Sequence, residues 1–133
     1  MHEEDTNIDQ VKPCWFIDLD WYQQNKRSFS DLARAHLCPK CNERLKENAS
    51  ANKLLSTIKD CCSKTPGFIT GNSPVLESIF RLFLANGNQP LDLDTLGEQL
   101  SEWRGIDTYR SSAEILSCLL KDEEYYGIRQ VTD

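Results

Sequence analysis

Apolar residues recur at helical spacing along the first half of the chain. The pattern predicts helices over 29–37, with Ser28 at the N-cap, and over 53–62. Before them, apolar and polar residues alternate from position 14 to position 22, which is the period of a strand. Asp20 leaves a second interpretation open for this stretch, a short helix that begins at its side chain.

The second half shows a clearer helical pattern, with a signal at the start of each element. Pro74 suits the first position of a helix, with Ser73 as its N-cap, and Asp92 suits the N-cap of a second helix. A third helix is expected to begin at Ser111 or Ser112. Residues 125–131 then have the pattern of a strand. Three short helices followed by a strand suggest a winged helix-turn-helix unit.

The boundary between the halves is expected in a stretch rich in proline and glycine. Residues 65–74 contain two of each, which is the composition of a linker. We therefore expect a mainly α-helical protein with a helical domain over 1–66, a linker over 67–73 and a winged-helix domain over 74–133, compatible with packing as one body. Domains of about 65 residues often need a metal ion or a disulfide for stability.

Cysteines give the N-terminal half its candidate chemistry. Cys38-Pro39-Lys40-Cys41 is a knuckle that can direct two thiolates to one metal ion. Cys61 and Cys62 follow the second helical pattern, and Cys14 lies upstream. Cys118 lies among leucines of the third C-terminal helix, so we expect it in the core.

We expect these cysteines to form a metal site. Neighbouring residues of a helix point about 100° apart, so one of the two adjacent cysteines is expected to bind and the other is not. The four expected ligands are Cys14, Cys38, Cys41 and Cys61. Cys62 and His36 are the alternates. Zinc is the first expectation and a [4Fe–4S] cluster the second, because four thiolates suit either.

Two other interpretations of the cysteines remain open. They could be free thiols that only pack in the core. The Cys-Pro-x-Cys sequence also occurs in redox sites, but there it follows a strand and begins a helix, whereas a helical pattern precedes it here. Redox catalysis is therefore the least favoured of the three.

The C-terminal half resembles a known family in several short segments. These are the first helix, the sequence Asn88-Gln89-Pro90-Leu91 before an Asp-capped helix, and the closing Tyr126-Gly127-Ile128-Arg129. On these features, residues 74–131 resemble the HARE-HTH type of winged helix, which occurs in the delta subunit of bacterial RNA polymerase. The resemblance implies a transcription-associated module that contacts protein or DNA.

The distribution of charge favours protein contact over DNA contact. Net charge is −6, and the first 66 residues hold ten basic and ten acidic residues. The remainder holds five basic and eleven acidic residues, so this half repels phosphate groups. A basic group does surround the knuckle: Lys26, Arg27, Arg34, Lys40, Arg44 and Lys46. With the aromatic residues upstream it could form a nucleic-acid face, but acidic residues are equally numerous in this half, so a mixed solvated surface is the favoured interpretation. The same cations could also hold an acidic partner.

These observations predict a non-catalytic, transcription-associated adaptor with a structural metal site. The sequence has no glycine-rich phosphate loop, no nucleophile elbow and no histidine-rich group, so we do not expect an enzyme. Trp103, Tyr109 and Tyr125 are candidate anchors for a protein partner. The alternative is a DNA-binding regulator that senses redox state through an iron–sulfur cluster.

The remaining expectations concern location and assembly. The first residues are acidic and polar, and no apolar run reaches the roughly 18 residues that span a membrane. We therefore expect a cytoplasmic protein. An acidic winged helix is also compatible with a homodimer.

Overall fold

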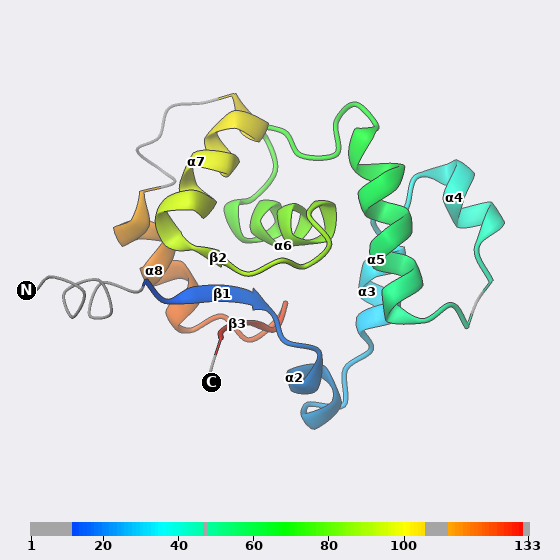
Figure 1. Cartoon of the computed structure of the whole chain (residues 1–133), viewed down its shortest axis with the longest axis horizontal. Coiled ribbons are helices and arrows are strands. Elements are labelled where there is room, and N and C mark those ends of the chain that lie inside the picture. The colour runs from blue at the N-terminus through cyan, green and yellow to red at the C-terminus, as the bar shows by residue number, and fades with distance from the viewer. Residues whose placement is uncertain (1–11, 47, 106–111, 132–133) are drawn as a thin grey trace, which may run out of the picture.

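A three-stranded antiparallel sheet connects the beginning of the chain to its end. The computed structural model describes residues 12–46, 48–105 and 112–131. The central strand, β1 (Cys14–Ile17), pairs on one side with β2 (Leu91–Asp92) and on the other with β3 (Ile128–Gln130). Helices form most of the rest (Figure 1), which confirms the prediction of a mainly α-helical protein with a cysteine cluster.

Each interpretation of the stretch after position 13 is correct in part. The strand ends at Ile17, and α2 (Leu19–Gln24) follows at once. The prediction that Asp20 caps this helix is wrong: Asp18 is the N-cap, because its carboxylate accepts a hydrogen bond from the Asp20 N–H at 3.0 Å. The alternating pattern continued past the end of the strand because Trp21, which fits the alternation, is a buried residue of the helix.

Serine caps begin two helices of the N-terminal half. The Ser28 hydroxyl accepts from the Asp31 N–H at 3.1 Å, as predicted, and the Ser50 hydroxyl accepts from the Lys53 N–H at 3.2 Å. The helix predicted over 53–62 therefore begins and ends two residues earlier. The elements are α3 (Phe29–Arg34), α4 (Pro39–Arg44), α5 (Ala51–Asp60) and the 3₁₀ turn η1 (Cys62–Lys64).

The C-terminal helices follow the predicted order. They are α6 (Val75–Ala85), α7 (Leu93–Arg104) and α8 (Ala113–Lys121). Asp92 and Ser112 cap the last two, as predicted, by accepting from backbone N–H groups three residues on. The prediction that Ser73 caps α6 is wrong, because Pro74 holds the N-cap position and its side chain makes no cap hydrogen bond. Ser111, the other candidate cap of α8, lies outside the described residues.

One apolar core extends through both halves of the chain. Figure 1 shows α6 between α7 and α5, and α6 packs against both. Phe68 and Ile69, within the predicted linker, are also buried in this core. The division into two domains stays a prediction, but the halves share a sheet and a core. No helix in the described ranges has the length and apolar character needed to cross a membrane.

A buried carboxylate fixes the segment between α8 and β3. Glu123 is 4% exposed, and its side chain accepts hydrogen bonds from the backbone N–H groups of Tyr125, Tyr126 and Ile128. Beside it, Gly127 has φ +67°, and a Cβ there would lie 2.6 Å from a ring carbon of Tyr22. Three backbone donors thus depend on one acidic side chain.

Glu123→Ala should lower the free energy of unfolding by about 3 kcal/mol, because it leaves one buried and two part-buried donors without their acceptor. Glu124→Ala is the matched control, since Glu124 is exposed, and it should change stability by less than about 0.5 kcal/mol. Urea denaturation of both variants measures the difference. Equal midpoints for the two variants would contradict the assigned role of Glu123.

Candidate metal centre

The start of α4 brings two cysteines to one side of a short helix. Cys38 is the N-cap with extended backbone (φ −70°, ψ 156°), as expected of a residue before proline. Pro39 takes the first helical position, where its missing N–H costs no hydrogen bond. Cys41 then lies in the first turn and is buried. The knuckle predicted from the sequence is therefore built by the proline.

The end of α5 brings two adjacent cysteines to the same place. The helix ends at Asp60, Cys61 has φ −128° and ψ −63°, and Cys62 begins η1. The expectation that adjacent cysteines would point about 100° apart assumed that the helix continued through both. Because the helix ends first, the thiols of Cys61 and Cys62 both reach the cluster.

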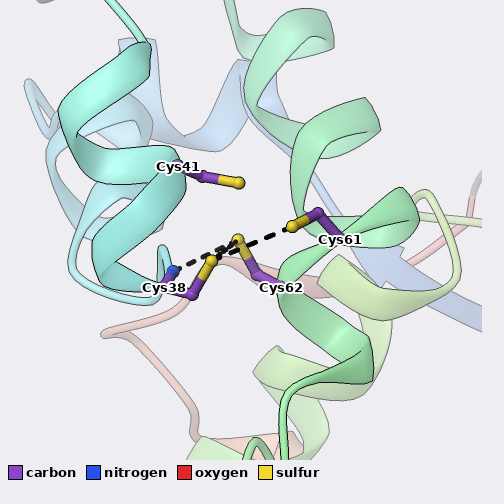
Figure 2. A group of neighbouring side chains, drawn as sticks. All are labelled: Cys38, Cys41, Cys61 and Cys62. Carbon is purple, nitrogen blue, oxygen red and sulfur yellow. Dashed lines mark hydrogen bonds between the residues drawn. The ribbon is translucent and has the colours of Figure 1, made fainter.

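Four sulfur atoms meet between these two segments. The Sγ atoms of Cys38, Cys41, Cys61 and Cys62 all lie within 4.8 Å of one another (Figure 2). The Cys38 sulfur is 3.5 Å from that of Cys62 and 3.9 Å from that of Cys61. The backbone N–H of Cys38 also donates to the Cys62 sulfur at 3.2 Å. The cysteines are unbonded, and this separation suits a shared ion.

The pKa values of the cluster thiols differ, because their surroundings differ. A hydrogen bond from the Cys41 backbone, and next one from the Cys62 thiol, lower the pKa of Cys38 to about 7. Burial raises the pKa of Cys41 to about 12, and burial also raises the pKa of Cys62. In the absence of metal, the Cys62 thiol therefore donates to a Cys38 sulfur that is partly thiolate near neutral pH.

Cys14 and His36 lie outside this group. Cys14 is on β1, where its thiol contacts the Lys12 carbonyl oxygen at 3.8 Å. The His36 ring packs against Phe80 with 5.5 Å between ring centroids, and burial lowers its pKa to about 4. Cys14 was predicted as the fourth ligand and Cys62 as an alternate. The group of four contains Cys62 and does not contain Cys14.

The expectation that Cys118 is in the core is wrong. Cys118 is exposed on α8, whereas Leu116 and Leu120 are buried. Two residues along a helix correspond to about 200°, so a residue midway between two core positions faces solvent. The spacing of Leu116 and Leu120 could therefore have predicted that Cys118 is exposed.

A groove of about 340 Å³ opens beside the cluster, and the sequence analysis did not predict it. Two cluster cysteines contribute to its wall, together with charged and polar side chains of α4 and α5. The lining residues are Cys41, Arg44, Leu45, Lys53, Ser56, Thr57, Asp60 and Cys61. The groove reaches the cluster at Cys41 and Cys61.

Comparisons of this chain with protein-family models, with curated proteins and with solved structures found no match. The resemblance of residues 74–131 to the HARE-HTH type therefore stays a prediction. What the geometry establishes is chemical: four cysteines lie close enough to hold one metal ion.

His36 should make stability depend on pH. Because its pKa is lower in the folded chain than the ordinary value near 6.5, the unfolded chain binds the proton more tightly. Stability from His36 is therefore complete above about pH 6.5 and is lost as the pH falls towards 4. His36→Gln should reduce the slope of unfolding free energy against pH between 4.5 and 6 by up to about 1.4 kcal/mol per pH unit.

Urea denaturation of wild type and variant across that pH range gives the two slopes. Subtracting them removes the contribution of the cysteines, which both chains share. Parallel slopes would show that His36 is not kept neutral by its packing on Phe80.

Proposed function

We propose that the chain is a non-catalytic adaptor in which one zinc ion joins α4 to the corner between α5 and η1. The observation that supports this most strongly is the meeting of four sulfur atoms within 4.8 Å. Structural zinc sites have four protein ligands and leave no position for a substrate. The proposed ligands are Cys38, Cys41, Cys61 and Cys62.

The spacing of the sulfur atoms favours a single ion over an iron–sulfur cluster. Four sulfurs at the usual 2.3 Å from one zinc ion lie about 3.8 Å apart in a tetrahedron. The contacts of 3.5 and 3.9 Å at Cys38 are close to this value. In a [4Fe–4S] cluster each thiolate binds a different iron, so the four sulfurs surround a larger body and lie farther apart.

The structure of α4 explains what the ion would contribute. This helix has six residues, too few for a helix to be stable by itself. Of those six, Cys41 is the buried one, so α4 offers little apolar surface to the core. A metal bond through Cys38 and Cys41 would supply the attachment that apolar packing does not.

Burial of two thiols makes metal binding depend on pH. Cys41 and Cys62 have raised pKa values and are protonated near pH 7 in the absence of metal. Binding must displace these protons, so the affinity for the ion falls as the pH falls.

The proposed partner of the adaptor is a protein, in keeping with the winged-helix resemblance. Tyr125 and Trp103 are exposed by 53% and 37% and are candidate anchors, and Arg27 stacks on the Tyr125 ring at 4.6 Å. Tyr109, the third candidate, lies outside the described residues. The exposed side of α8 has Glu114 and Ser117 where a DNA-reading helix needs basic or amide side chains, and its basic residue, Lys121, lies at the last position. DNA binding is therefore the less favoured proposal.

Native mass spectrometry with elemental analysis tests the metal site. Wild type should contain one zinc ion per chain, and the metal-free protein should melt at a lower temperature. Cys62→Ser should weaken zinc binding by more than about 100-fold, because it removes one of four ligands. Cys14→Ser and Cys118→Ser are matched controls that should keep the ion.

Two results would contradict the proposal. One is a metal-free chain with the same melting temperature as the chain supplied with zinc. The other is loss of the ion in Cys14→Ser together with its retention in Cys62→Ser. A salt series of duplex gel shifts separately tests the adaptor: tight binding that weakens steeply with salt would favour the DNA-binding alternative.

A further inference from the structure

We propose that Cys38 and Cys62 form a reversible disulfide when peroxide oxidises the cluster, and that this bond releases the metal ion. The inference rests on the proposed metal site and adds a modification to it. Two sulfur–sulfur contacts shorter than 4 Å meet at Cys38, and the one with Cys62 is the shorter, at 3.5 Å. If Cys38 is oxidised, the Cys62 sulfur is therefore already close enough to react with it.

A disulfide between these residues needs little movement. The sulfurs must approach from 3.5 Å to about 2.05 Å, which side-chain rotation can supply. The Cys38 N–H already contacts the Cys62 sulfur at 3.2 Å, so the two segments also meet at the backbone. Figure 2 shows the two side chains pointing at each other from α4 and η1.

The adjacent cysteines are poorly suited to pair with each other. Consecutive Cα atoms are about 3.8 Å apart, whereas disulfides usually need about 4.4–6.8 Å. A bond between Cys61 and Cys62 would therefore distort the peptide that joins them. Cys38 is free of this constraint, because 24 positions separate it from Cys62.

Access and contact distance together favour Cys38 as the residue that peroxide attacks. Cys38 and Cys61 are half-buried, whereas Cys41 and Cys62 are buried. Of the two accessible residues, Cys38 has the shorter sulfur contact, 3.5 Å to Cys62, and Cys61 is the chain neighbour of Cys62. The attacking Cys38 thiolate breaks the O–O bond of hydrogen peroxide, becomes a sulfenic acid and releases hydroxide, which takes up a proton to give water. The Cys62 thiolate then displaces hydroxide from Cys38, and this hydroxide takes up a second proton from solvent to give water.

The electrons balance without a redox change at the metal. Two thiol sulfurs are oxidised, one peroxide is reduced to two waters, and zinc remains divalent. Two cluster thiols then remain, Cys41 and Cys61, which is too few for a stable four-coordinate site. The new bond still connects α4 to the corner after α5, so a covalent link takes the place of the metal link.

The test uses the full chain loaded with zinc and treated with one to several equivalents of hydrogen peroxide. Native mass spectrometry should show loss of the ion and a protein mass lower by about 2 Da, the two hydrogens of one disulfide. Dithiothreitol followed by zinc should restore the starting mass. A chain that contains no metal before oxidation would refute the proposed function, and disulfide mapping would still test the pairing.

Trypsin makes the mapping specific. Cleavage after Arg34, Lys40 and Arg44 separates Cys38 (peptide 35–40) from Cys41 (peptide 41–44), and Cys61 and Cys62 share the peptide 60–64. Oxidised protein should yield peptide 35–40 linked to peptide 60–64, and fragmentation should assign the bond to Cys62. Cys14→Ser and Cys118→Ser chains should give the same linked pair.

Other products would overturn the inference. These are a main disulfide between peptides 35–40 and 41–44, a bond assigned to Cys61, or peroxide-treated protein that keeps its ion and its mass. Conversion of Cys38 to sulfinic acid as the main product would show that Cys62 does not reach it in time.

Discussion

The meeting of four cysteine sulfurs within 4.8 Å of one another is the constraint on which the proposed metal site depends. Four thiolates can satisfy one tetrahedral ion only if both segments that supply them turn at the right residue. Pro39 sets the turn before α4, and the end of α5 at Asp60 sets the turn before η1. In the proposed site, the ion would fix the position of α4, since this helix buries Cys41 alone among its residues.

The cluster is connected to the rest of the molecule through apolar packing. The helix that delivers Cys61 buries Leu54, Leu55 and Ile58 and packs against α6. Helix α6 also packs against β1, and the sheet joins β1 to two strands of the C-terminal half. Loss of the ion should therefore act first on α4 and reach the sheet only through the shared core. In the proposed adaptor, the metal site would stabilise one corner and leave the exposed Trp103 and Tyr125 in place.

Local signals predicted most of the helices, but the pairing of the strands was not predictable from the sequence. Ser28, Asp92 and Ser112 cap helices as expected, because a cap depends on residues only three positions away. The partners of β1 lie more than 70 residues along the chain, and four residues of alternating pattern do not specify them. Three of the four clustered cysteines were the expected ligands. The fourth required knowing that α5 ends before Cys61.

In the proposed metal site, four cysteine sulfurs and no other ligand atoms surround one zinc ion. X-ray absorption at the zinc edge is the decisive measurement, because the fine structure reports the type, number and distance of the atoms bound to the metal. We expect four sulfur scatterers at about 2.3 Å and no nitrogen or oxygen bound to the zinc. A first shell with one or more nitrogen or oxygen atoms near 2.0–2.1 Å would contradict it.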